Sequence, residues 1–213
     1  MRKDYFRYYK PGMLISVILI LSFLSGWTIT FLSQIIDKIP ECSDFKPPTV
    51  SAIIMGIFVI LDKYGLKTPL IKKLFWVSNI SGRYEGEIKY KNPITQEEET
   101  KPCAVEIKQT ASFVKVKSYF EFNNENNKEK TESFSLVSSI IEDEDGSQEL
   151  VFTYYNKGKR GLAPSNGTNI LKILKQKDGK TILDGVYYTD REPNQTKGEM
   201  RVEYKSNKLK NEY

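Results

Sequence analysis

Hydrophobic residues are concentrated in two uninterrupted runs near the N-terminus, whereas most of the remaining chain alternates hydrophobic and polar positions. The run over residues 13–32 holds no charged side chain. Because a helix rises about 1.5 Å per residue, such a run can cross a hydrocarbon core of about 30 Å. A second run covers residues 50–61 and follows Pro47 and Pro48, which favour a helix start. Extended to residues 48–66, it predicts a second span.

A cleaved signal peptide is the alternative interpretation of the first run. The apolar core is too long for a signal peptide, no cleavage site of small residues follows it, and a second run comes soon after. We therefore expect a transmembrane helical hairpin over residues 1–76, with spans at about 13–32 and 48–66. A second domain is expected over residues 77–213.

The charges beside the two runs set the expected orientation. Residues 1–12 carry four basic residues and one acidic residue, and residues 62–76 carry the same numbers. The link over residues 33–49 carries two basic and three acidic residues. Because positively charged flanks stay in the cytoplasm, the sequence predicts a multi-pass membrane protein with both termini cytoplasmic. Cys42 then lies in the outer link and Cys103 in the cytoplasmic domain, so we expect no disulfide between them.

From residue 81 onward the hydrophobic pattern has a period of two, which is typical of strands with one polar face. Turn-forming residues such as Asp145 and Gly146 separate eight such segments. Eight strands with short links predict a membrane-anchored all-β domain, an up-and-down antiparallel β-barrel without open edges. A β-sandwich is the alternative, and residues 205–213 are expected to be a solvated end. The expected strands cover about residues 82–91, 103–109, 114–122, 130–141, 148–157, 168–175, 183–189 and 197–204.

The chemistry of many enzymes is missing from this chain. It contains no histidine, which excludes His-based triads and HExxH zinc sites, and no CxxC, P-loop or GxGxxG motif is present. The acidic run over residues 142–145 is a weak calcium candidate and is better explained as a solvated turn. We expect no enzymatic activity, no cofactor and no metal site. Residues 77–213 hold 22 basic and 22 acidic side chains, so their overall charge does not favour DNA or RNA.

Polar and aromatic residues occupy inward positions that a small barrel can fill with Leu and Val. Tyrosine rings can stack on bases, and an arginine at the barrel mouth can bind a phosphate through two hydrogen bonds. Asn156, Thr189 and Arg191 fall at one end of the expected barrel, beside the loop that begins near Lys157. The alternative is that the tyrosines belong to the packed core and Arg191 begins a turn. The candidate ligand-binding residues are Tyr84, Tyr154, Asn156, Tyr187, Thr189 and Arg191.

Three short motifs, taken with the paired N-terminal runs, resemble a known family. They are the entry into the second run (residues 47–49, PPT), its exit (residues 61–64, LDKY), and the opening of the β domain (residues 80–86, ISGRYEG). This organisation resembles the effectors of bacterial CBASS anti-phage systems that have two transmembrane helices and a β-barrel. The resemblance covers nearly the whole chain, and Tyr84 stands where tryptophan is common in that family.

The resemblance implies a mechanism. A cognate synthase of the CD-NTase type makes a cyclic dinucleotide during phage infection, and the ligand binds the barrel. The protomers then form a homo-oligomer that disrupts the lipid bilayer of the inner membrane, and the cell dies. Two other interpretations stay open. One is a membrane-tethered lipocalin- or avidin-like barrel that binds a small or apolar ligand without killing. The other is a scaffold barrel that binds a protein partner, which a fully packed interior would favour.

Overall fold

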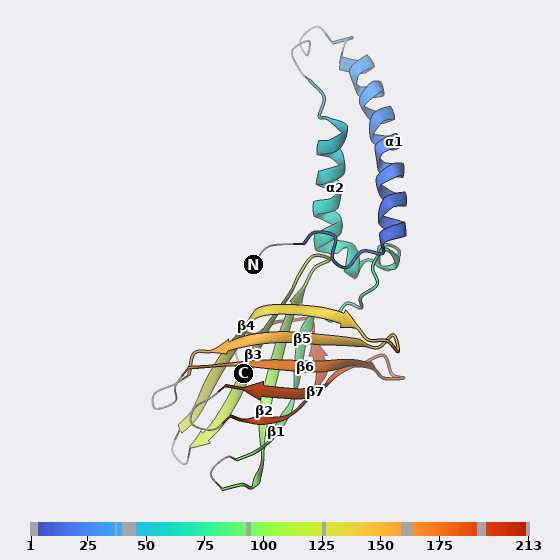
Figure 1. The fold of residues 1–213 in the computed structure, drawn as a ribbon. Helices are drawn as coiled ribbons and strands as arrows, with labels where there is room; N and C mark the ends of the chain where they lie inside the picture. Colours follow the sequence, from blue (N-terminus) through green and yellow to red (C-terminus); the bar gives the residue numbers. More distant parts are fainter. Residues whose placement is uncertain are drawn as a thin grey trace. The chain divides into compact units, whose positions relative to one another are not determined.

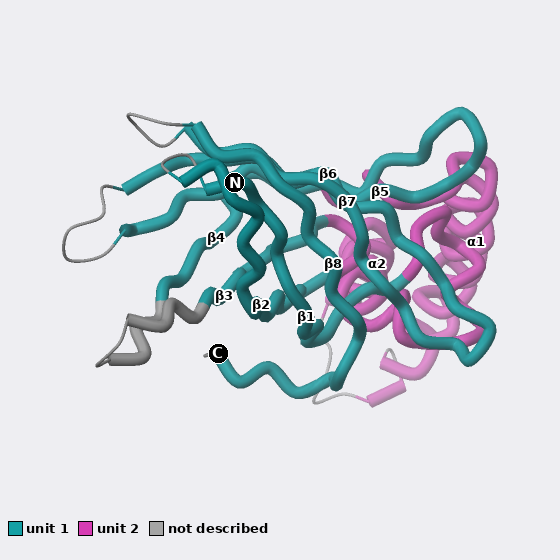
Figure 2. The backbone as a smooth tube through the Cα atoms, turned by 90° about the horizontal axis from the view of Figure 1, so that it is seen from below, with its two compact units in different colours: residues 1–3, 79–109, 113–213 teal, residues 4–78, 110–112 magenta. Residues whose placement is uncertain are grey.

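The computed structural model describes residues 4–36, 38–39, 46–92, 95–124, 127–158, 164–190 and 195–211, and for residues 121–130 only the backbone. The chain divides into two compact units, which Figure 2 distinguishes by colour. The helical unit comprises residues 4–78 and the short segment 110–112, and the barrel unit comprises residues 79–109 and most of the chain from residue 113 onward.

The helical unit contains two helices that pack side by side, α1 (Pro11–Ile36) and α2 (Val50–Tyr64) (Figure 1). Helix α1 has 26 residues and is about 39 Å long at the usual rise. Its most apolar window has a mean hydropathy of 2.1 and is almost entirely exposed. Within the described part of the chain, α1 alone is long and apolar enough to cross a membrane.

The expected second span is therefore wrong in length. Helix α2 has 15 residues, about 22 Å, instead of the 19 residues expected over 48–66. It begins at Val50 because the Thr49 hydroxyl caps it by accepting a hydrogen bond from the Ala52 amide. It ends at Tyr64, where the 3₁₀ helix η2 (Gly65–Lys67) follows. In the last turn of α2, the Asp62 carbonyl accepts a hydrogen bond from the Ala111 amide at 3.0 Å. Ala111 lies outside the helix, in the segment 110–112.

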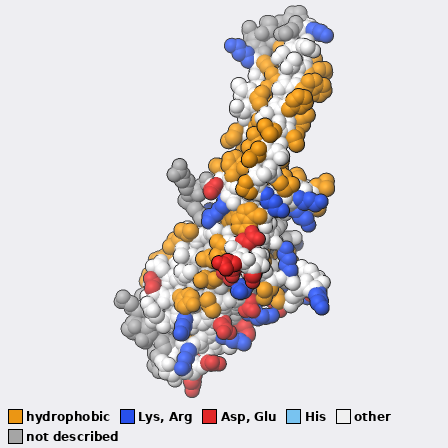
Figure 3. All heavy atoms as spheres, turned by 45° about the vertical axis from the view of Figure 1, so that its right-hand side comes forward, with side chains coloured by type: hydrophobic (Ala, Val, Ile, Leu, Met, Phe, Trp, Pro, Cys, Tyr) orange, Lys and Arg blue, Asp and Glu red, His pale blue; other side chains and the backbone are white. Residues whose placement is uncertain are grey.

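The two ends of the helical unit are paired with each other. Tyr9 forms a β-bridge with Phe75, just after the 3₁₀ helix η3 (Ile71–Leu74), and the Trp76 amide donates to the Tyr8 carbonyl at 3.1 Å. The Tyr9 ring also packs against Phe75 and Phe58 with edge-on geometry. Hydrophobic side chains cover much of the visible face of the helices, and Lys and Arg side chains gather near the helix ends (Figure 3). The segment before α1 and the segment after η3 therefore lie side by side.

The barrel unit is a closed, antiparallel, up-and-down barrel, in which each strand pairs with its neighbours in sequence and β1 pairs with β8 (Figure 1). This confirms the predicted fold class of the β domain and excludes the β-sandwich. The strands are β1 (Gly82–Lys91), β2 (Glu98–Gln109), β3 (Val114–Asn124), β4 (Asn127–Glu142), β5 (Gln148–Asn156), β6 (Ser165–Lys175), β7 (Thr181–Thr189) and β8 (Lys197–Ser206).

Four strands begin earlier than the sequence pattern indicated: β2, β4, β6 and β7. Strand β2 starts at Glu98 because Pro102 is tolerated within it. Pro102 pairs with Glu87 of β1, whereas the pairing of β2 with β3 begins only at Cys103, so the missing amide of the proline interrupts no ladder on that side. Strand β6 starts at Ser165, paired with Asn156, inside a segment that we expected to be loop.

The inward side chains form a packed half and a polar half along the length of the barrel. The inward side chains near the β4–β5 and β6–β7 turns are completely buried, as the leucines Leu150, Leu171 and Leu183 show. Cys103 is also inward, has a free thiol and is 0% exposed. Burial raises the pKa of this thiol to about 12, so it stays protonated at neutral pH. Cys42 lies outside the described residues.

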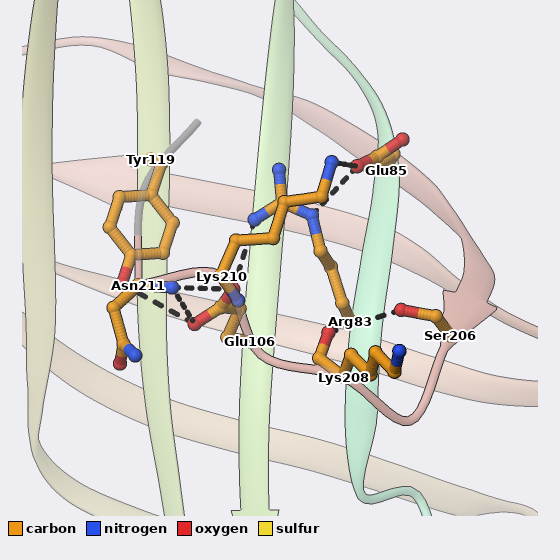
Figure 4. A network of polar contacts seen from close by, with 8 residues as sticks. All are labelled: Arg83, Glu85, Glu106, Tyr119, Ser206, Lys208, Lys210 and Asn211. Atoms are coloured by element: carbon orange, nitrogen blue, oxygen red, sulfur yellow. Dashed lines mark hydrogen bonds and ion pairs between the residues drawn. The ribbon is translucent and has the colours of Figure 1, made fainter.

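The described residues after β8 are mostly exposed, as the sequence suggested, but their backbone is bound to the barrel. The backbone amides of Lys210 and Asn211 donate to the Glu106 carboxylate of β2, at 2.7 and 3.2 Å (Figure 4). Arg83 of β1 forms an ion pair with the same carboxylate at 2.9 Å, and both side chains are 2% exposed. Arg83 also binds Glu85 and, through this hydrogen bond, lowers the pKa of Glu85. The tail thus completes a buried ionic cluster on the outer face.

Candidate functional site

A cavity opens at one end of the barrel, between the β1–β2, β5–β6 and β7–β8 connections. The space between its lining side chains is about 640 Å³, including the part that is open to solvent at the mouth. Seven strands contribute to it, because their inward positions all reach the same lumen. The lining residues are Ile88, Tyr90, Lys101, Phe120, Tyr154, Asn156, Ser165, Asn169, Tyr187, Thr189, Thr196 and Met200.

Two lining tyrosines lie against glycines on the neighbouring strand. Tyr154 of β5 is paired with Gly167 of β6, and its ring occupies the place that a Cβ atom on Gly167 would need. Tyr187 of β7 is paired with Gly198 of β8, where a Cβ atom would lie 2.8 Å from the ring atom Cε1. Because glycine has no side chain, each ring can lie close to the barrel wall. The rings thereby leave the lumen open instead of filling it.

Four of the six candidate ligand-binding residues come together in this cavity: Tyr154, Asn156, Tyr187 and Thr189. The Asn156 Oδ1 atom accepts the Gly158 amide at 2.9 Å, which orders the start of the β5–β6 connection. The Thr189 hydroxyl is 2.7 Å from the Thr196 hydroxyl across the β7–β8 connection. Arg191 and most of the β5–β6 loop lie outside the described residues.

Tyr84 lies apart from the other candidates. It points inward and is 1% exposed, but it is not among the residues that line the cavity. Its hydroxyl donates to the Ile80 carbonyl at 3.0 Å, and its ring packs edge-on against Tyr204 at 5.6 Å. Burial raises the pKa of this phenol. Tyr84 therefore closes the start of β1 as a core residue, as the alternative interpretation of the tyrosines had it.

Lys101 is a lining residue that the sequence analysis did not select. It sits two positions before Cys103 and so shares the inward face of β2. The signal was present in the alternation, but Pro102 made the strand appear to begin after it. With a side chain that is 27% exposed, Lys101 reaches the mouth of the cavity from within the lumen.

The rim beside Lys101 is an ordered polar cluster. The Lys101 ammonium lies 4.8 Å from the ring centre of Tyr90 and 3.5 Å from the Glu99 carboxylate. Glu99 also accepts hydrogen bonds from the Asn92 amide and the Tyr90 hydroxyl. These bonds, with the charge of Lys101, hold the pKa of Glu99 below its usual value. An ammonium has three donor hydrogens, so Lys101 can bind Glu99 and an anionic ligand at the same time.

Metal chemistry finds no support in the described residues. No group of three or more His, Cys, Asp or Glu side chains in that part of the chain is arranged to hold a metal ion. The acidic run over residues 142–145 crosses from the end of β4 into the β4–β5 turn, and its residues are exposed. What the cavity offers is stacking surfaces, hydrogen-bonding groups and one cationic side chain.

The fold and the cavity define a class: a closed β-barrel with a polar, aromatic-lined cavity at one end, in a chain with an apolar N-terminal helix. The family model named Cap15, cyclic dinucleotide receptor domain, matches residues 75–204. Because the match covers more than half of the chain, the protein belongs to this family and carries a cyclic dinucleotide receptor domain of a CBASS effector. The match spans nearly all of the barrel and leaves α1 and α2 outside it. No curated protein and no solved structure matches the chain.

Proposed function

We propose that this protein is the membrane-disrupting effector of a CBASS system and has no enzymatic activity. A cyclic dinucleotide from a cognate CD-NTase binds in the lumen cavity, the liganded protomers oligomerise, and their apolar helices disrupt the inner membrane, so that the infected cell dies. The observation that carries this proposal is the joining, in one chain, of a receptor barrel with a polar, aromatic-lined cavity and an apolar helix of 26 residues.

The ligand contacts are proposed from the chemistry of the cavity. Tyr154 and Tyr187 present ring faces on which bases can stack, at a typical gain of roughly 1–3 kcal/mol per base. Asn156 and Thr189 supply hydrogen-bonding groups near the mouth. Lys101 binds a phosphate from one side, and Arg191, as the sequence predicts, binds from the loop after β7. Local groups must provide this affinity because residues 77–213 carry equal numbers of basic and acidic side chains.

The orientation in the membrane is supported by two independent features. Residues 1–12 and 62–76 each carry an excess of three positive charges, which favours the cytoplasmic side for both. The backbone pairing of Tyr9 with Phe75 brings these two segments together. We propose that α1 crosses the inner membrane and that α2 returns the chain to the cytoplasmic face, so that residues 1–12, residues 62–76 and the barrel lie in the cytoplasm, where the ligand is made.

Two measurements on the full chain test the proposal. Calorimetry in detergent, with a panel of cyclic dinucleotides, should find at least one ligand that binds. Liposomes that contain the protein and an entrapped dye should then leak only after that ligand is added, because leakage requires the liganded oligomer. Binding without leakage or oligomerisation would contradict the effector function. If no cyclic dinucleotide binds but an apolar probe does, the protein acts as the lipocalin-like barrel instead.

A further inference from the structure

Buried oxygen atoms without a partner gather on the inner wall of the barrel. Among the described residues they are the side-chain oxygens of Thr131, Ser133, Asn169 and, in the β4–β5 turn, Ser147. Thr131 pairs with Phe120 and Ser133 with Asn156, and both partners line the cavity, so these two hydroxyls also face the lumen. Asn169 differs from the two hydroxyls because it lines the cavity itself.

The position of Asn169 is deep and enclosed. It lies four residues from Ser165 at the mouth, about 13 Å along β6, and is 2% exposed. In the register of the sheet it stands between Phe152 of β5 and Tyr187 of β7. Two residues further along β6, Leu171 is completely buried and belongs to the packed half. The carboxamide of Asn169 therefore stands at the floor of the cavity, where the polar half of the lumen ends.

A buried amide oxygen without a donor is unfavourable for the folded protein, since it has lost its hydrogen bonds to water. Asn156 provides a contrast within the same cavity, because its Oδ1 atom is used by the Gly158 amide. An apolar side chain at residue 169 would suit the fold better than asparagine does. The amide is thus placed for a group that enters the cavity and not for the barrel itself.

We propose that Asn169 is the residue that reads a base of the ligand and thereby sets which cyclic dinucleotides the receptor accepts. This inference rests on the proposed binding of the ligand in the lumen. The carboxamide places one acceptor and one donor side by side, which matches a base edge that presents a donor next to an acceptor, as adenine does. The ring of Tyr187, which neighbours Asn169 and lines the cavity, lies beside the base, and the phosphates stay near Lys101 at the rim.

The experiment compares the full-length protein with Asn169→Leu, measuring the Kd for a panel of cyclic dinucleotides with different bases and the thermal midpoint without ligand. We expect the preferred ligand to lose at least tenfold in affinity while weak ligands change less than threefold, so that the spread of affinities narrows. The midpoint of the ligand-free protein should stay the same or rise. Asn169→Ala removes the same amide without adding bulk and gives the same result if Leu disturbs the packing.

Two control variants make the result specific. Lys172→Leu changes an exposed residue on the same strand and should leave every Kd unchanged. Asn156→Leu loses the bond to Gly158 and should lower the ligand-free midpoint. The proposal is overturned if Asn169→Leu lowers the ligand-free midpoint as much as Asn156→Leu does, or if the spread of affinities is unchanged. If the parent protein binds no member of the panel, the result contradicts the proposed function, and the role of Asn169 that rests on it is contradicted as well.

Discussion

Lys101 is the one charged side chain among the described residues that line the cavity. Its ammonium is fixed by the Tyr90 ring and the Glu99 carboxylate, so a phosphate meets an ordered partner at the rim. An ordered cation loses less conformational entropy on binding than a free surface lysine does. Lys101 therefore has the position and the charge that the sequence analysis sought in Arg191.

Replacing Lys101 with Gln should weaken binding of the cyclic dinucleotide by about tenfold or more, because a hydrogen bond to a charged group contributes roughly 1.5–3 kcal/mol. The difference in affinity between the parent and Lys101→Gln should become smaller as salt is added, since salt screens the charge of the parent lysine. Calorimetry at two salt concentrations measures both effects. Lys108→Gln, an exposed lysine on the same strand, is the matched control and should match the parent. Equal affinities for Lys101→Gln and the parent would remove Lys101 from the site.

The sequence predicted the residues of the candidate site where the alternation of hydrophobic and polar residues shows which side chains face inward. Alternation places Tyr154, Asn156, Tyr187 and Thr189 on the inner face, and they line one cavity. Alternation does not report depth along the barrel, so it grouped Tyr84 with residues that lie elsewhere. Asn169 was missed because the sequence does not tell whether the amide of an inward asparagine has hydrogen-bond partners within the barrel.

At the scale of elements, strands were easier to predict than their ends. The eight strands follow from a period of two, which every strand of a closed barrel shares. Their starts depend on local pairing, as Pro102 shows, because the same residue is disruptive or harmless according to which neighbour its missing amide faces. The end of α2 carries a helix-stop pattern, because Lys63 lies in its last turn and Gly65 follows Tyr64, and the span expected to reach residue 66 ran past this pattern.

The tail and strands β1 and β2 form one stabilising element through Glu106. Replacing Glu106 with Gln should lower the free energy of unfolding by roughly 1.5–3 kcal/mol, because the buried Arg83 guanidinium keeps Glu85 but loses its charged hydrogen bond to Glu106. Denaturant unfolding of the full chain in detergent measures the change. Glu87→Gln, an exposed carboxylate on β1, should have little effect.

The double variant Arg83→Met with Glu106→Gln tests the cause of that loss. Removing the arginine also removes the buried charge that Glu85 alone is left to pair, so the double variant should be more stable than Glu106→Gln alone. The two changes would then be non-additive, as expected for residues in direct contact. The free energy of unfolding of Arg83→Met alone is needed for comparison. If the losses of the two single variants simply add up in the double variant, the ion pair is not what stabilises this face.

At the scale of the whole molecule, the orientation of the barrel decides whether a cytoplasmic ligand can reach it. Cys103 cannot report this orientation, because burial keeps its thiol protonated and inaccessible on either side of the membrane. The Lys180→Cys variant places a cysteine in the exposed β6–β7 turn, and it is a suitable probe when Cys42→Ser and Cys103→Ala remove both native thiols. We expect a membrane-impermeant thiol reagent to label the Lys180→Cys variant in permeabilised cells and not in intact cells. Labelling in intact cells would place the barrel outside.

The last prediction separates sensing from killing. Phe23 lies near the middle of α1 and is 77% exposed, so a charge there meets lipid directly. A lysine at the centre of a spanning helix costs roughly 2.5–3.5 kcal/mol on insertion scales. Phe23→Lys should therefore abolish ligand-dependent dye release and cell death, whereas the Kd of the cyclic dinucleotide, measured in detergent, should stay within about twofold of the parent because α1 contributes no residue to the cavity. Phe23→Leu, which keeps the position apolar, should kill as the parent does. Killing by Phe23→Lys at parental strength would mean that toxicity does not require α1 to insert, and the barrel would have to act on the cell by another route.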